Sequence, residues 1–410
     1  MHTPFGLLRS PQSILFGPGQ RHALGRVARA IGQRLLVCTD QRLAAEPAFD
    51  ALLRDLRAAG VETSVYDGTQ PELPLAGVLD CVQRSRAFRP QLVLGLGGGS
   101  CMDMAKLVSL LLAHEELTLD DCYGELRVPG PILPVIAMPT TSGTGSEVTP
   151  VAVVADDRRD LKVGVSSPHL IPQTAICDPE LTLSCPPGLT AHAGADALTH
   201  AIEAFTAVRR EATPGLALER VFVGKNALSD THALAAITAL ARHLPAAVEN
   251  GSDLAARAGV MLGALHAGLA FGTSGTAAAH AIQYPVGALT HTPHGVGVAV
   301  LMPYVMAFNR PACGAEFAQI ARAMGVAGDD EARLADAAID AVAALLRRIG
   351  IPATLADLGL PAERVDWVAA QSLLAARLVT NNPRPLDEPA LAAIIAAALG
   401  GSSHRNPLPA

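Results

Sequence analysis

Short apolar runs alternate with amphipathic segments through the first third of the chain. The runs have the length of buried strands and lie at residues 13–16, 34–39, 61–66, 91–96 and 132–138. Between the first two runs, residues 20–31 have the spacing of an amphipathic helix. Buried strands that alternate with helices predict a parallel sheet covered by helices on both faces.

The pattern changes near residue 185, where strand-like runs give way to Ala-rich helical segments. Residues 194–203, 335–349 and 388–399 are examples. A length of 410 residues also exceeds the usual size of a single core. We therefore predict an α/β domain at residues 1–185 and an all-α domain at residues 186–410, with a disordered tail after residue 400.

Composition and charge favour a cytoplasmic protein. Half of the residues are hydrophobic but only 3% are aromatic, so the core is expected to consist of Ala, Val and Leu. The net charge of −7 gives no reason to expect nucleic acid or an anionic membrane as a partner. The N-terminus has no leader-like pattern, and no uninterrupted apolar stretch reaches the roughly 18 residues that span a bilayer. Seven scattered cysteines without a CxxC pair are typical of reduced thiols.

Candidate metal ligands lie in the second half of the chain. Asp196 and His200 are four residues apart, so a helix places both on one face about one turn apart. His280 and His294 follow in two further segments. One carboxylate and three imidazoles can hold Fe(II) or Zn. A helix-surface pair is the alternative for the first two residues, but their Ala- and Leu-rich surroundings favour a buried site.

Polar residues and glycines follow the predicted strands. The glycines of residues 97–100 precede a helix predicted from residue 102, where they allow a pyrophosphate to approach; a plain strand-to-helix turn is the alternative. Asp40 lies at the end of another strand. An acid at this place can accept hydrogen bonds from a ribose and repel a 2′-phosphate. Alternatively, Asp40 caps the next helix. The hydroxyl-rich run 139–146 contacts a ligand or forms a solvated loop.

Several of these motifs together resemble the iron-containing (group III) alcohol dehydrogenase family. They are the Gly97 to Ser100 turn with Asp103 and Lys106, the run 139–147, the Asp196/His200 helix and the His280 to His294 segment. They occur in family order, and the resemblance covers roughly residues 10–385. It implies a dehydroquinate synthase-like fold, with a nucleotide-binding parallel sheet in the first domain and the metal in the all-α second domain.

The resemblance also implies roles for individual residues. The expected metal ligands are Asp196, His200, His280 and His294. The expected NAD-binding residues are Asp40, Gly97, Gly98, Gly99, Ser100, Asp103, Thr140, Thr141, Ser146 and Lys162. The expected metal is Fe(II), with Zn as an alternative.

The implied activity is that of an NAD-dependent enzyme that interconverts an alcohol and an aldehyde or ketone by hydride transfer at a cleft between two domains. Its partner is then a small-molecule alcohol or aldehyde, and we also expect a homodimer. A hydroxyacid–oxoacid transhydrogenase with tightly held NAD is an alternative. A lyase of the dehydroquinate-synthase type is a less favoured one.

Two departures from the family pattern bear on catalysis and substrate. Many members have a histidine one helical turn after the third ligand, where this chain has Tyr284, which either relays a proton or lines the pocket. Residues 207–226 form a longer loop than in simple alcohol dehydrogenases. Its basic residues either meet a carboxylate-bearing substrate or are solvated.

Overall fold

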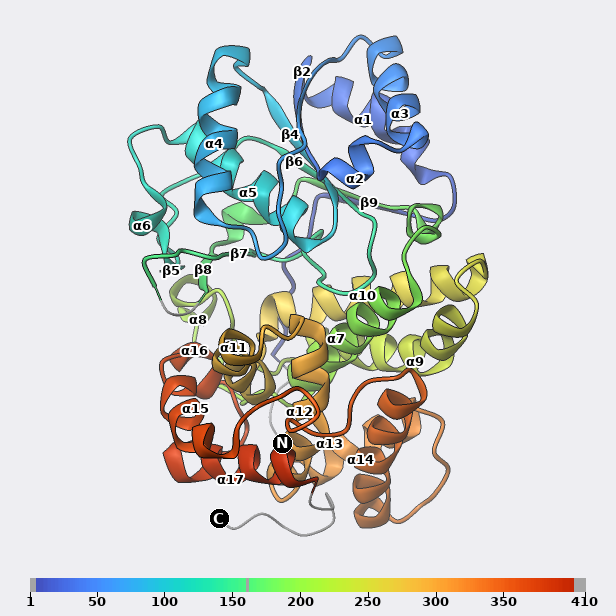
Figure 1. The fold of residues 1–410 in the computed structure, drawn as a ribbon, viewed down its shortest axis with the longest axis vertical. Coiled ribbons are helices and arrows are strands. Elements are labelled where there is room, and N and C mark those ends of the chain that lie inside the picture. The colour runs from blue at the N-terminus through green and yellow to red at the C-terminus, as the bar shows by residue number, and fades with distance from the viewer. Residues whose placement is uncertain (1–4, 160–161, 402–410) are drawn as a thin grey trace. The chain divides into compact units, whose positions relative to one another are not determined.

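The computed structural model describes residues 5–159 and 162–401 (Figure 1). Most of the tail predicted after residue 400 lies outside these residues. The chain divides into two compact units. The sheet unit comprises Arg9–Ser184 and Ala217–Val221, and the helical unit comprises Met1–Leu8, Cys185–Leu216 and Phe222–Ala410.

The sheet unit contains a six-stranded, all-parallel sheet in the order β1-β9-β6-β4-β2-β3. Its strands are β1 (Ser13–Phe16), β2 (Arg34–Cys38), β3 (Glu62–Tyr66), β4 (Leu92–Gly97), β6 (Val135–Pro139) and β9 (Thr174–Cys177). The predicted parallel sheet is confirmed. A second sheet of three short strands was not predicted, and its strands are β5 (Gly124–Glu125), β7 (Val151–Val154) and β8 (Val163–Ser166).

Helices cover both faces of the large sheet. They are α1 (Leu24–Ile31), α2 (Gln41–Ala44), α3 (Pro47–Ala58), α4 (Leu75–Ser85), α5 (Gly99–Ala113) and α6 (Leu119–Cys122). Successive residues of β2 face opposite sides, so Leu36 belongs to one buried cluster and Val37 to another. Helix α5 begins at Gly99, three residues earlier than predicted, because Gly99 is itself the first residue of the helix and Gly98 is its N-cap.

The helical unit has one large core built mainly from Ala, Val, Leu and Ile. Its helices are α7 (Pro187–Thr206), α9 (Ala227–Glu249), α10 (Leu254–Ser274), α11 (Ala278–Thr290), α12 (His294–Asn309), α13 (Gly314–Ala323), α14 (Glu331–Arg348), α15 (Val365–Ser372), α16 (Ala376–Val379) and α17 (Glu388–Gly400). The short helix α8 (Leu216–Glu219) belongs to the sheet unit except for its first residue. Small residues allow close packing: a Cβ on Gly194 would lie 2.2 Å from a methyl carbon of Leu244.

Helix α7 lies in the middle of this core, packed against α9, α10 and α12. Helix α10 is long and apolar enough to cross a membrane, but 67% of its most apolar 18-residue stretch is buried inside the protein. Burial of that extent is typical of a core helix. The helical unit thus holds α7, which carries Asp196 and His200, firmly from several sides.

Candidate metal centre and cofactor site

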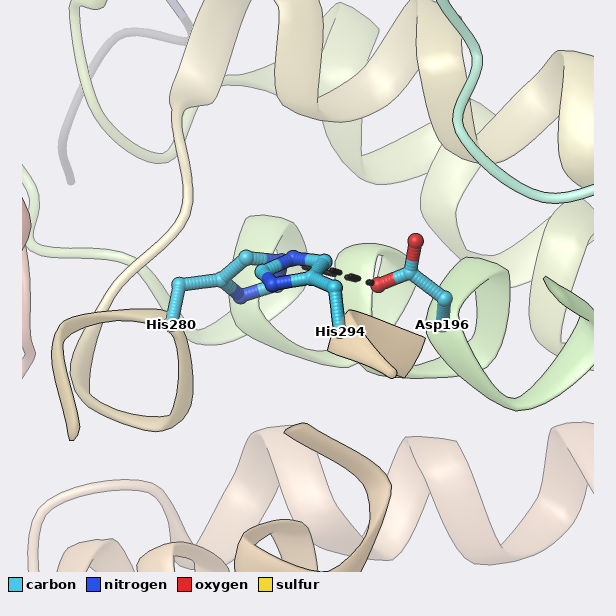
Figure 2. A group of neighbouring side chains, drawn as sticks. All are labelled: Asp196, His280 and His294. Carbon is cyan, nitrogen blue, oxygen red and sulfur yellow. Dashed lines mark ion pairs between the residues drawn. The ribbon is translucent and has the colours of Figure 1, made fainter. Parts of the chain in front are cut away.

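Asp196, His280 and His294 come together from three different helices (Figure 2). One ligand atom of each lies within 4.8 Å of the others. Asp196 Oδ1 is 3.7 Å from Nε2 of His280 and 3.9 Å from Nε2 of His294. The Asp196 and His280 side chains are almost fully buried, whereas that of His294 is 31% exposed. The cluster is therefore open on the side of His294.

The fourth predicted ligand lies beside the same carboxylate. His200 Nε2 is 3.7 Å from Asp196 Oδ1, as expected for two residues one turn apart on α7. The His200 ring stacks between Phe271, at a centroid distance of 4.2 Å, and His280, at 4.7 Å. This stacking fixes the ring plane. The structure thus brings all four predicted ligand residues together.

A glycine lets the start of α12 approach α7. His294 is the first residue of α12, and Gly295 follows it. A Cβ on Gly295 would lie 2.4 Å from the carbonyl oxygen of His192 and 3.2 Å from the Cβ of Asp196. Any side chain there would push His294 away from the carboxylate, so the position requires glycine.

Glu203 orients His280 and was missed in the sequence. Its buried carboxylate accepts a hydrogen bond from His280 Nδ1 at 2.7 Å and others from the backbone N–H groups of Ala277 and Ala279 at 2.7 and 2.6 Å. Burial raises the pKa of Glu203, but the attraction of His280 and these hydrogen bonds outweigh it, so the net pKa is lowered. Asp196, His200 and Glu203 follow the i, i+4, i+7 spacing of one helix face, a signal that could have identified Glu203.

These residues fit a divalent metal ion. Because the proton on His280 Nδ1 is donated to Glu203, the lone pair of Nε2 points toward the other ligands. That Nε2 is buried and has no hydrogen-bond partner among the described residues. Ligands about 2.1 Å from a tetrahedral metal lie roughly 3.4 Å apart, close to the 3.7–3.9 Å between Asp196 Oδ1 and the imidazole nitrogens.

Tyr284 lies one turn after His280 on α11, in the predicted register. Its ring stacks toward that of His294 at a centroid distance of 6.2 Å. Burial raises the pKa of the Tyr284 hydroxyl, an effect that Arg377 opposes and that Glu203 and Asp196 reinforce. The phenol is therefore protonated at neutral pH.

In the sheet unit, the predicted cofactor turn lies between β4 and α5. Gly97 ends β4 with a φ of 146°, and Gly98 is the N-cap of α5. A Cβ on Gly99 would lie 2.7 Å from the side chain of Thr144, whereas one on Gly98 would have nothing closer than 3.7 Å. The side of the turn at Gly98 is thus open, as an approaching phosphate requires.

Asp40 fulfils the alternative role considered for it. Its Oδ1 accepts a hydrogen bond of 2.9 Å from the backbone of Leu43 and so caps α2. Its Oδ2 is 4.0 Å from the thiol of Cys101, in the first turn of α5. Capping uses one oxygen, so it is compatible with a ribose contact by the other.

Two predicted cofactor residues bind each other. Asp103 Oδ1 accepts a hydrogen bond from the Ser146 hydroxyl at 2.5 Å, and Oδ2 accepts one from the backbone of Val153. Burial raises the pKa of Asp103, and the nearby Lys106 ammonium offsets this only in part, so the net pKa is raised. Burial also lowers the pKa of Lys106 to about 8, and its ammonium donates to backbone carbonyls of Thr149 and Val151. This network anchors the hydroxyl-rich loop to α5.

The remaining predicted cofactor residues lie at separate places in the sheet unit. Thr140 is buried, and its backbone N–H donates to the carbonyl of Gly97, whereas Thr141 is half-buried. Ser100 lies in the first turn of α5. Lys162 forms an ion pair with Glu72.

Comparison with known proteins identifies the family. Residues 11–179 match the family model of iron-containing alcohol dehydrogenase, and residues 190–399 match the C-terminal model of the Fe-containing alcohol dehydrogenase family. The chain is 36% identical to long-chain-alcohol dehydrogenase 1 of Geobacillus thermodenitrificans, with 92% of each chain covered. It is 33% identical to the NAD-dependent methanol dehydrogenase of Bacillus methanolicus, covering 95% of this chain and 98% of that one.

Solved structures agree with this assignment. A structure of 1,3-propanediol oxidoreductase superposes with a TM-score of 0.88 at 33% identity, covering 96% of this chain and 100% of that one. The predictions of an enzyme, of alcohol–aldehyde interconversion and of NAD and iron as cofactors are thereby confirmed, together with the fold class. The chain belongs to the iron-containing alcohol dehydrogenase family.

Proposed function

We propose that the protein holds Fe(II) with Asp196, His200, His280 and His294 and uses NADH to reduce a small aldehyde, or NAD to oxidise the corresponding alcohol. The observation that carries this proposal is the convergence of three imidazole Nε2 atoms on Asp196 Oδ1. One of them, the buried Nε2 of His280, has no hydrogen-bond partner among the residues that the structure describes. When bound, the metal supplies Lewis-acid polarisation of the substrate oxygen, and the nicotinamide supplies the hydride acceptor or donor.

Residues of the protein orient a metal ligand, leave a route for the substrate and transfer the proton. Glu203 holds His280 in the tautomer that directs its Nε2 lone pair to the ligand cluster. The exposed side of His294 leaves a route for substrate. Tyr284, with a neutral hydroxyl, donates a proton to the substrate oxygen during reduction and accepts it back during oxidation.

We expect the cofactor to bind at the turn between β4 and α5. The open face of Gly98 and the N-terminus of α5 receive the pyrophosphate. The second oxygen of Asp40 accepts a hydrogen bond from the adenosine ribose, and its charge disfavours a 2′-phosphate. Thr140, Thr141 and Lys162 are expected to contact the rest of the cofactor. Asp103 and Ser146 act by holding the loop in place.

We also propose an oligomeric state and a cellular location. We expect a homodimer that works in the cytoplasm, in keeping with seven buried cysteines, all of them free thiols. A transhydrogenase with tightly held NAD is the second candidate function, because a tyrosine at the position of Tyr284 resembles the hydroxyacid–oxoacid transhydrogenase branch of the family.

Free NADH consumption separates the two. The purified protein, reconstituted with Fe(II) under anaerobic conditions, is mixed with NADH and a panel of short aldehydes. A dehydrogenase oxidises one NADH per aldehyde, and chelation of the metal abolishes this. A transhydrogenase leaves free NADH unchanged yet exchanges hydride between a hydroxyacid and an oxoacid. If neither reaction occurs with the iron-loaded protein, the proposed function is wrong.

A further inference from the structure

The segment between α10 and α11 leads directly to His280 and is held by a side chain from elsewhere in the helical unit. Asn381 follows α16, which packs beside α11 (Figure 1). Its side-chain NH2 group donates hydrogen bonds to the carbonyls of Ser274 and Thr276, at 3.0 and 3.1 Å. Because carbonyl oxygens only accept, the orientation of the amide is defined. Asn381 therefore fixes two peptide groups of the segment.

One of these peptide groups is held at both of its ends. The carbonyl of Thr276 and the N–H of Ala277 belong to the same planar trans peptide group and point in opposite directions. Asn381 donates to that carbonyl, and that N–H donates to Glu203 Oε2 at 2.7 Å. The same Oε2 accepts the hydrogen bond from His280 Nδ1, also at 2.7 Å. A continuous chain of hydrogen bonds thus runs from Asn381 through one peptide group and Glu203 to the imidazole.

The hydrogen bonds of this chain strengthen one another. A donor at a carbonyl polarises the peptide group, which makes the N–H of that group a better donor in turn. The chain is also shielded from water, since Asn381, Glu203 and His280 are only 2%, 1% and 4% exposed. In such surroundings each hydrogen bond is stronger than in water, and a missing one costs more. Loss of the Asn381 donors should therefore weaken the hold of Ala277 on the Glu203 carboxylate.

Asn381 serves this segment through its donors. Its Oδ1 is buried and has no hydrogen-bond partner among the residues that the structure describes. A buried unpaired oxygen lowers stability, so an apolar side chain would fill the same space at a lower cost. Gly275 lies between the two bound carbonyls with a φ of 84°, and a Cβ on it would lie 3.0 Å from the Asn381 amide nitrogen. The close approach of the amide thus depends on a glycine.

The long loop at residues 207–226 supports the same arrangement. At its start, the backbone N–H of Val208 donates to the Asn381 carbonyl at 2.9 Å. Near its end, the backbone N–H of Val223 donates to the Thr273 carbonyl at 2.8 Å, directly before the segment that Asn381 holds. The loop thus fixes both Asn381 and the start of the segment, which gives this departure from the family pattern a structural role.

We propose that Asn381 is a positioning residue for the metal ligand His280. It acts through the peptide group of Thr276 and Ala277, which holds the Glu203 carboxylate that orients the imidazole. Both of its side-chain donors are used by backbone carbonyls, so its effect on the metal is indirect. This inference rests on the metal site of the proposed function and adds a residue on which the affinity of that site depends.

The test is a double-variant cycle with Glu203→Gln. Metal affinity is measured by competition for Zn between the protein and a chelator of known affinity. Asn381→Ala removes both donors and should weaken Zn binding by about 10-fold, the low end of the range for residues that orient a metal ligand. If Asn381 acts through Glu203, adding Asn381→Ala to Glu203→Gln should weaken binding by less than about 2-fold further, whereas independent effects would multiply.

A second readout needs neither metal nor turnover. In the metal-free protein, hydrogen exchange at the N–H groups of Ala277 and Ala279, followed by NMR, reports whether Glu203 still holds them. Exchange at both groups should be faster in Asn381→Ala than in the unaltered protein.

The matched control is Asn382→Ala, which removes the same side chain one position further along. The Asn382 amide is also buried and also donates to two acceptors, Asn309 Oδ1 at 2.8 Å and the Arg384 carbonyl at 2.7 Å. Neither acceptor belongs to the segment before His280. The control should lose thermal stability but keep both the Zn affinity and the exchange rates of the unaltered protein.

The outcomes separate this inference from the proposed function. If the unaltered protein binds neither Zn nor Fe(II), the proposed function fails. If Glu203→Gln weakens Zn binding but Asn381→Ala behaves like Asn382→Ala, only the assignment of Asn381 is overturned. Losses that multiply in the double variant would make Asn381 a purely structural residue and would equally overturn the assignment. Should Asn381→Ala fail to fold, Asn381→Ser, which keeps one donor, takes its place in the cycle with the same criteria.

Discussion

Replacing Glu203 by glutamine removes the charge behind His280 while keeping the shape of the side chain. The carboxylate accepts three hydrogen bonds, two at Oε2 from His280 Nδ1 and the Ala277 N–H and one at Oε1 from the Ala279 N–H. Glutamine has only one accepting oxygen. In one orientation its NH2 group faces the Ala279 N–H, and in the other it faces His280 Nδ1.

Each orientation has a defined cost. Facing Ala279, the NH2 group leaves a buried backbone donor unpaired, which costs about 1–3 kcal/mol of stability. Facing His280, it forces Nδ1 to accept and moves the ring proton to Nε2, where it blocks the lone pair that the metal needs. Loss of a partner of this kind weakens metal binding by about 10- to 100-fold, or about 1.4–2.7 kcal/mol.

The assay is a competition titration of Fe(II) or Zn between the protein and a chelator of known affinity, followed by thermal unfolding with and without metal. Asp230→Asn is the matched control, because it also removes an acid with a basic partner in the helical unit, Lys225, away from the ligands. Both variants should lose thermal stability, but only Glu203→Gln should lose metal affinity. Unchanged metal affinity in Glu203→Gln would refute the orienting role.

Three further predictions concern the proton and the cofactor. Tyr284→Phe removes only the hydroxyl, so turnover should fall by about 10- to 100-fold with metal content unchanged. If the variant has the turnover and the pH–rate profile of the unaltered enzyme, Tyr284 only lines the pocket. Asp40→Ala should relax discrimination against NADP(H), and it should also lower thermal stability by about 1 kcal/mol through loss of the α2 cap; equal use of NADP(H) by the unaltered protein would contradict the ribose role. Gly98→Ala places a methyl group on the open face of the turn without a clash, so NAD binding, measured by calorimetry, should weaken at constant thermal stability. If the NAD affinity of Gly98→Ala equals that of the unaltered protein, the pyrophosphate does not bind at Gly98.

The large sheet was predictable because its strands are buried on both faces. Such strands form continuous apolar runs, and five of the six were found within three residues of their observed ends. The strands of the small sheet, two to four residues long, were missed. The start of α5 was misplaced because glycines are poor helix formers, yet here Gly99 packs against Thr144 and tertiary contacts decide.

The candidate site was predictable only in part. The spacing of Asp196 and His200 places them on one face of a helix. His280 and His294 belong to other helices, so the sequence offered them only as candidates, and the family resemblance was needed to assign them as ligands. Glu203 follows the same spacing and was overlooked, since its partners are backbone groups of a distant segment.

The measurement that tests the metal centre most directly is anomalous X-ray diffraction from crystals of the iron-loaded protein, recorded on either side of the iron absorption edge. We expect a single strong peak about 2.0–2.3 Å from Asp196 Oδ1 and from Nε2 of His200, His280 and His294. A peak that contacts only three of these residues would remove the fourth from the ligand set. A peak away from all four, or none in protein that contains stoichiometric iron, would show that these residues do not hold the metal.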